Sequence, residues 1–175
     1  MLSRKSDYAK VLIFSILCAI LPDGDVLGFK FGVAYGDFLG HRGFIHSIFF
    51  ATLVGFSITT LFFRIVQPFS KDWWKLSIYF AVIGSSHGVL DAFTNGGLGI
   101  ALLAPFDNTR YFFWARPIAV SPINPEKFMT MQGLMILANE FLWVWLPSIF
   151  IVLIYKGLSC LKRIGQQLLD KLFST

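Results

Sequence analysis

Seven side chains able to bind a metal ion interrupt an otherwise very apolar sequence, near the ends of its hydrophobic segments. All three histidines of the chain belong to this set. Ionisable groups at membrane depth are costly, so they usually persist because an ion, a partner or a substrate requires them. The set predicts a metal centre at one face of a membrane, and its members are Asp23, Asp25, His41, His46, His87, Asp91 and Glu140.

Three of these positions are expected to lie within helices. His87 and Asp91 are four residues apart, so one helix face would carry both side chains toward a single ion. A helix histidine that satisfies its hydrogen bonds locally is the alternative interpretation of this pair. Glu140 lies within the last apolar segment, where an unpaired carboxylate is costly, so we expect it to have a partner.

The other four candidates lie where the chain is expected to change direction. Asp23 and Asp25 follow Pro22, and turn formation or helix capping is the alternative role of such a pair. His41 and His46 are five residues apart, so they converge only if a loop gives way to a helix between them. Each pair has an ordinary explanation alone, but their meeting at one membrane face favours a shared site.

The residue types indicate which metal the centre would hold. Imidazole and carboxylate ligands favour Zn²⁺, and carboxylate-rich sites also bind Mn²⁺ or Mg²⁺. Seven candidates exceed the four ligands of a tetrahedral ion, so we expect two ions, or one ion with further carboxylates that orient its ligands. The first-choice ligands are His41, His46, His87 and Asp91, with Asp23, Asp25 and Glu140 as additional ones.

A centre of this kind would activate a water molecule for attack on an electrophile at neutral pH. Asp23, Asp25 or Glu140 would act as general base or bridge two ions, and the sequence leaves the choice among them open. Arg42, next to His41, is expected to hold a phosphate by charge-assisted hydrogen bonds. Contact with lipid headgroups alone is the alternative role of this arginine.

The composition identifies an integral membrane protein. The 175 residues are 55% hydrophobic and 14% charged, with a mean hydropathy of +0.66. A soluble domain carries about 25% charged residues, and a chain this small cannot bury so much apolar surface in an aqueous core. We predict a single domain over residues 1–175. The net charge of +5 forms no basic stripe of the kind that binds nucleic acid.

Four apolar segments predict an all-α fold with about four transmembrane helices, at residues 8–21, 44–66, 73–93 and 129–155. Residues 95–127 are rich in Pro, Gly and aromatic residues, which excludes a continuous helix and predicts an ordered flap at the membrane interface. Pro147 is expected to kink the fourth helix. Residues 156–175 predict a C-terminal amphipathic helix on the membrane surface.

The basic residues predict the orientation of these helices. Of the 15 Lys and Arg residues, most fall on the side that holds both termini, and the rest are Lys30, Arg42, Arg110, Arg116 and Lys127. The positive-inside rule then predicts that both termini are cytoplasmic. All seven metal-ligand candidates would lie toward the extracytoplasmic face, provided that the short first segment spans the membrane.

The combined motifs resemble the YdjM-type family of bacterial inner-membrane proteins, which are regarded as metal-dependent hydrolases. The motifs are Leu-Pro-Asp-x-Asp, His-Arg-x-x-x-His-Ser, Ser-His-x-x-Leu-Asp and a late Glu before Trp-Leu-Pro, within residues 21–147. The resemblance implies metal-site roles for the same seven residues. The Ser-His-x-x-x-Asp element is also loosely similar to zinc-dependent phospholipase C enzymes and related nucleases, which implies phosphoester chemistry.

We therefore predict a metal-dependent hydrolase of the bacterial inner membrane, which cleaves a lipid or lipid-linked phosphoester at the outer face. The alternatives are a transporter of protons or metal ions and a non-catalytic membrane factor with a structural metal. Conduction would require polar groups across the whole membrane depth, whereas the inner halves of the segments are almost purely apolar. The sequence leaves the substrate and the oligomeric state open.

Overall fold

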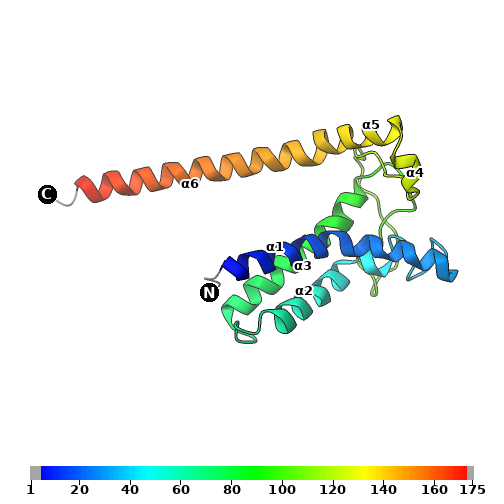
Figure 1. Cartoon of the computed structure of the whole chain (residues 1–175), viewed down its shortest axis with the longest axis horizontal. Coiled ribbons are helices and arrows are strands. Elements are labelled where there is room, and N and C mark those ends of the chain that lie inside the picture. The colour runs from blue at the N-terminus through cyan, green and yellow to red at the C-terminus, as the bar shows by residue number, and fades with distance from the viewer. Residues whose placement is uncertain (1–4, 173–175) are drawn as a thin grey trace. The chain divides into compact units, whose positions relative to one another are not determined.

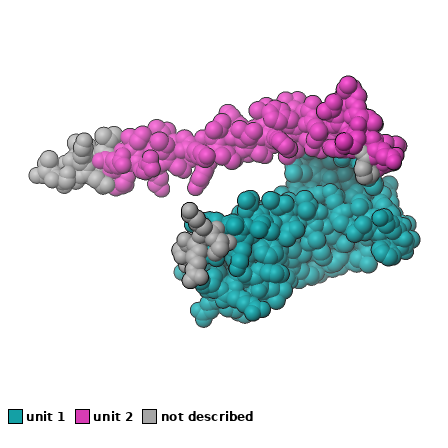
Figure 2. Space-filling view, in the orientation of Figure 1, with its two compact units in different colours: residues 1–123 teal, residues 124–175 magenta. Residues whose placement is uncertain are grey.

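The computed structural model describes residues 5–172 and divides the chain into two compact units, Met1–Ile123 and Asn124–Thr175 (Figure 2). The described residues form helices and loops, and their only β pairings are two isolated bridges. The all-α prediction is therefore confirmed. The elements are α1 (Lys5–Ile20), η1 (Leu21–Phe31), η2 (Phe44–His46), α2 (Ile48–Phe62), α3 (Lys71–Ala92), α4 (Pro125–Phe128), α5 (Met131–Glu140), η3 (Phe141–Trp145) and α6 (Leu146–Leu172).

The first apolar segment is longer than its hydrophobic run indicates. Pro22 lacks the N–H that would continue the ladder of α1, and the chain winds on as a 3₁₀ helix, η1. Gly32 ends η1 in a left-handed conformation with φ of 80°, which glycine adopts without steric cost. A 3₁₀ helix turns by about 120° per residue, so Asp23 and Asp25 leave this element in different directions.

Helices α2 and α3 begin at serine caps and pack closely against each other (Figure 1). The hydroxyl of Ser47 accepts a hydrogen bond from the backbone N–H of Phe50, and Ser70 caps α3 in the same way. A Cβ on Gly55 of α2 would lie 2.6 Å from the carbonyl oxygen of Ser77 in α3. Glycine is needed at this crossing because the two backbones touch.

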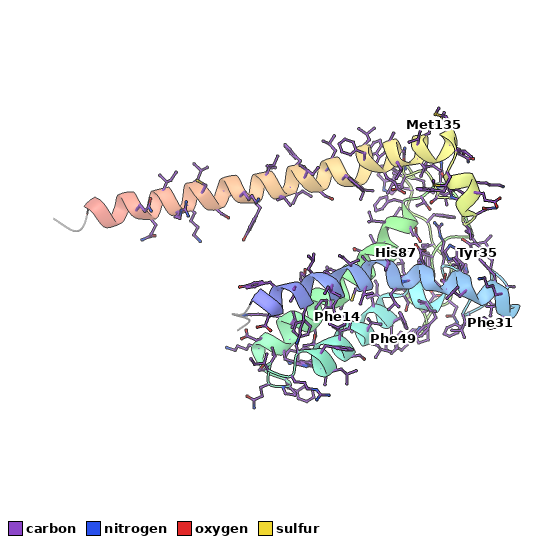
Figure 3. All side chains as sticks on the ribbon, in the orientation of Figure 1. Phe14, Phe31, Tyr35, Phe49, His87 and Met135 are labelled. Atoms are coloured by element: carbon purple, nitrogen blue, oxygen red, sulfur yellow. The ribbon has the colours of Figure 1, made fainter. Side chains whose placement is uncertain are left out.

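Helix α1 completes the helical packing of the first unit. Its residue Cys18 is buried with Ile58 of α2 and Phe80 of α3, and Phe14 packs on this cluster (Figure 3). Near the other end of α3, a Cβ on Gly88 would lie 2.4 Å from the carbonyl oxygen of His46. The same close packing therefore brings η2, just before α2, against the C-terminal part of α3, which carries His87 and Asp91.

The segment after α3 is irregular and ordered, as far as residue 123 of the first unit. Its apolar residues Ile100 and Ala104 are fully buried. The N–H of Ala101 donates to the carbonyl oxygen of Arg42, and the N–H of Ile48 donates to that of Leu102. Backbone hydrogen bonds thus fasten this segment to the loop before α2. Its predicted position at the membrane interface stays a prediction.

In the second unit, α5, η3 and α6 form one continuous helix (Figure 1). Just before Pro147 the helix contains a π turn, in which the N–H of Leu146 bonds to the carbonyl oxygen of Phe141, and the predicted kink stays a prediction. The wider turn accommodates a residue that has no N–H to give to the ladder. Residues 156–172 continue α6, so the predicted C-terminal helix is not separate from the fourth apolar segment.

Two helical segments among the described residues are long and apolar enough to cross a membrane, Asp7–Phe31 and Met131–Gln167. Helix α2 is apolar but has 15 residues, because its predicted first turn is the short 3₁₀ helix η2 and the cap at Ser47. Helix α3 has 22 residues and is not among the two. Four transmembrane helices therefore stay a prediction.

Candidate metal centre

Six of the seven predicted ligands lie in the first unit, and four segments of chain carry them. Asp23 and Asp25 belong to η1, His46 to η2, and His87 and Asp91 to α3, while His41 lies in the loop before η2. Their donor atoms form two groups in which all atoms are within 4.8 Å of one another. The first group is Asp23, His46, His87 and Asp91, and the second is Asp25, His41 and His46.

The spacing within the first group matches a tetrahedral metal ion. The Nε2 atom of His87 is 3.3 Å from Oδ1 of Asp23 and 3.7 Å from Oδ2 of Asp91. The Nε2 atom of His46 is 3.7 Å and 3.4 Å from the same two oxygens. Bonds of about 2.0–2.2 Å to a tetrahedral ion separate its ligand atoms by about 3.3–3.6 Å. The two imidazoles and two carboxylates could therefore share one ion.

The hydrogen bond of His87 determines which nitrogen faces this group. Its Nδ1 lies 2.8 Å from the carbonyl oxygen of Ala19 in α1. A carbonyl oxygen only accepts, so Nδ1 carries the proton and the neutral ring has a lone pair on Nε2. That lone pair is buried, has no hydrogen-bond partner and faces carboxylate oxygens. Electron-pair donors that face one another in this way fit a bound cation.

Asp25 orients His46 from the opposite side of the imidazole ring. Oδ2 of Asp25 lies 3.0 Å from Nδ1 of His46, which leaves Nε2 of the same ring for the first group. Both side chains are fully buried. The contact is short but not aligned as a hydrogen bond, because Nδ1 has no geometrically acceptable partner. A carboxylate behind a histidine is the usual way in which a metal-binding ring is held.

His41 contacts this carboxylate and not the first group. Its Nδ1 lies 2.7 Å from Oδ1 of Asp25, and its ring packs edge-on against the rings of Tyr35 and His46. Burial raises the pKa of Tyr35, against the opposing effect of the positive charge of Arg42. The phenol is therefore protonated at neutral pH. The sequence made His41 a first-choice ligand, whereas Asp23 takes the fourth position in the tetrahedral spacing.

Arg42 is enclosed by the protein. Its side chain is 4% exposed, and its NH2 group donates to Oδ1 of Asp91 at 3.1 Å. Its NH1 group donates to the hydroxyl of Thr94 and to the carbonyl oxygen of Gly96. Both terminal nitrogens of the guanidinium are thus committed to protein acceptors. In this arrangement the contact of the guanidinium with the cluster is its hydrogen bond to Asp91.

Arg110, which lies in the predicted interfacial flap, holds the loop before α2. Its guanidinium donates to the carbonyl oxygens of Tyr35, Asp37 and His41. Burial lowers the pKa of Arg110, and the arginine stays charged at neutral pH. No spacing pattern in the sequence signals these contacts, because all the acceptors, the carbonyl oxygen of Gly99 included, are backbone atoms.

Glu140, the remaining candidate, belongs to the second unit. It is the last residue of α5 and directly precedes the π turn. Neither of the two groups that could hold a metal includes it. Its role as ligand or base stays a prediction from the sequence.

These observations define the class of protein: a helical protein with two candidate membrane spans and a histidine and aspartate cluster that could bind a metal ion. The chain belongs to the YdjM inner membrane protein family, whose profile matches residues 1–164. It is 37% identical over 148 residues to inner membrane protein YbcI of Escherichia coli (strain K12), a match that covers 82% of this chain and 81% of that protein. No solved structure matches the chain significantly. The predicted family and inner-membrane location are confirmed.

Proposed function

We propose that this protein is a membrane-embedded metal-dependent hydrolase with one Zn²⁺-type site. The single observation behind the proposal is the first group, in which two buried imidazole nitrogens without hydrogen-bond partners face two carboxylate oxygens at tetrahedral spacing. Asp23, His46, His87 and Asp91 are the proposed ligands. Mn²⁺ or Mg²⁺ would fit less well, because these ions prefer oxygen ligands.

The residues of the chain have separate tasks in this proposal. When bound, the ion would lower the pKa of a coordinated water and polarise the bond to be cleaved. Asp25 holds the rings of His41 and His46. Asp23 has a side chain that is 59% exposed, so the site opens to substrate on its side. A water molecule or a substrate oxygen would exchange with this carboxylate, or Asp23 would accept the proton of the attacking water.

The proposed substrate is a lipid or lipid-linked phosphoester, and the surroundings of Asp23 support it. The neighbouring residues Ile20 and Leu21 are exposed apolar side chains, as is Leu90 beside Asp91. Such a rim would suit a substrate whose apolar tail stays in the bilayer while its headgroup reaches the carboxylates. The loose similarity of the Ser-His-x-x-x-Asp element to zinc-dependent phospholipases favours a phosphoester over other bonds.

A panel of phospholipids and isoprenoid phosphates tests this function. Detergent-purified protein with Zn²⁺ is expected to release phosphate or a phosphorylated headgroup from at least one of them, and a chelator should remove the activity because the ion supplies the nucleophile. Product release is measured by chromatography. Turnover that persists with the chelator would exclude the metal mechanism. A metal-loaded protein inactive on the whole panel would favour a non-catalytic role or another bond.

The orientation in the membrane is a second part of the proposal. With both termini cytoplasmic, Asn108 would be extracytoplasmic and Gln67 cytoplasmic. Single cysteines at these exposed positions, in a background without Cys18 and Cys160, are to be labelled from outside intact cells with a membrane-impermeant maleimide. We expect the label at residue 108 and not at residue 67. The reverse pattern would overturn this orientation.

A further inference from the structure

We infer that Arg42 is a positioning residue of the proposed metal site, which holds two carboxylates of the cluster through its backbone and its side chain. The inference rests on the proposed function. Arg42 has φ of 64°, a left-handed conformation that is unfavourable for a residue with a side chain. Backbone conformations of this kind are retained where surrounding contacts require them.

The backbone of Arg42 makes one set of the contacts that require the left-handed conformation. In the left-handed conformation its N–H donates to Oδ2 of Asp25 at 3.1 Å, and its carbonyl oxygen accepts from the N–H of Ala101. Asp25 is the carboxylate that contacts the rings of His41 and His46. The backbone N–H therefore fixes the anion that orients the imidazole of His46.

The side chain of Arg42 makes the other set of contacts, and these position Asp91. Its NH2 group binds Oδ1 of Asp91, and Oδ2 of the same carboxylate is directed to Nε2 of His46 and His87. The second nitrogen, NH1, is anchored on Thr94 and Gly96, so the planar group cannot rotate freely. The guanidinium thus presents one oxygen of Asp91 to the ion and also offsets the negative charge of the three aspartates.

This arrangement distinguishes positioning from substrate binding. A phosphate-binding arginine needs free donors directed to solvent, whereas both terminal nitrogens of Arg42 are bonded to protein, and its Nε, which has no partner, is buried. Its deletion should therefore weaken metal binding in the absence of any substrate. Loss of a residue that orients a metal ligand typically lowers metal affinity by about 10–100-fold.

Three substitutions separate the backbone from the side chain. Arg42→Gly keeps the left-handed turn, because glycine adopts positive φ freely, but removes the guanidinium. Arg42→Ala removes the guanidinium and retains the backbone strain, while Arg42→Lys restores a charge without the planar fork. Arg110→Lys is the matched control, since Arg110 fastens the same loop through backbone carbonyls and the ring of Tyr35 and bonds to no carboxylate of the cluster.

The readouts are the dissociation constant for Zn²⁺, from competition with a chromogenic chelator, and the visible absorption of the Co²⁺-substituted protein. We expect about 10–100-fold weaker binding for Arg42→Gly, a greater loss for Arg42→Ala and partial rescue by Arg42→Lys, each with an altered cobalt spectrum. Arg110→Lys should keep the wild-type spectrum and affinity. Wild-type affinity and spectrum in Arg42→Gly, or equal losses in Arg110→Lys, would overturn the inference. A wild-type protein that binds no metal would overturn the proposed function together with it.

Discussion

Replacing His87 with alanine is expected to abolish stoichiometric metal binding by the purified protein. The substitution removes one of four donors, and no other histidine or cysteine in the described part of the chain belongs to the first group except His46. The affinity should fall by more than the about 10–100-fold typical of a residue that only orients a ligand. Metal content by elemental analysis after dialysis in detergent provides the measurement.

Alanine substitutions at the other two histidines make the prediction specific. His46→Ala should behave like His87→Ala, because both rings present Nε2 to the same two oxygens. His41→Ala should retain the ion with weaker affinity, because that ring contacts Asp25. Full occupancy in His46→Ala and His87→Ala would refute the site. A loss in His41→Ala as large as in His87→Ala would instead indicate an ion among Asp25, His41 and His46.

Replacing Asp23 with asparagine is expected to remove most of the hydrolytic activity without unfolding the protein. Asparagine has the same shape but no charge, so it can neither accept the proton of the attacking water nor stabilise the cation as well. The loss of several kcal/mol of transition-state stabilisation corresponds to about 10³-fold or more in rate. The side chain is 59% exposed, so little packing changes. Initial rates at saturating Zn²⁺ and a thermal melt in detergent measure the two effects.

Asp107→Asn is the matched control for this experiment. Asp107 is an exposed carboxylate that accepts hydrogen bonds from Thr109 and Tyr111 within its own turn. These bonds hold the pKa of Asp107 below its ordinary value, but the residue has no contact with the cluster. Its replacement should leave turnover unchanged. An Asp23→Asn enzyme with near wild-type rate and bound metal would exclude Asp23 from the reaction.

The long helices could be predicted from the sequence because their signals are local. The predicted third segment, residues 73–93, agrees closely with α3 at Lys71–Ala92, where the cap at Ser70 sets the first turn. The start of α2 was predicted four residues too early, because hydrophobicity alone does not reveal the cap at Ser47. The 3₁₀ winding after Pro22 and the π turn before Pro147 depend on backbone hydrogen bonding, which a hydropathy pattern does not encode.

The sequence identified the residues of the site, but it did not show how they divide into two groups of facing ligand atoms. Costly ionisable groups in an apolar chain single out the candidates without a structure. Their grouping depends on side-chain direction: η1 turns Asp23 toward His87 and Asp25 toward His41. The sequence also places Arg42 beside His41 but gives no sign of its left-handed backbone, which directs the guanidinium to Asp91.

The continuous helix of the second unit has a practical consequence for imaging this small protein. The candidate span within it, Met131–Gln167, has 37 residues, which corresponds to about 55 Å at 1.5 Å per residue. The hydrocarbon layer is about 30 Å thick, and ordinary tilts of up to about 40° cannot absorb the excess. If this helix spans the membrane, several of its turns would therefore project into water, and Lys162 and Arg163 near its C-terminal end are suited to that position. A helical protein fused in register to those turns would serve as a fiducial marker for electron cryo-microscopy.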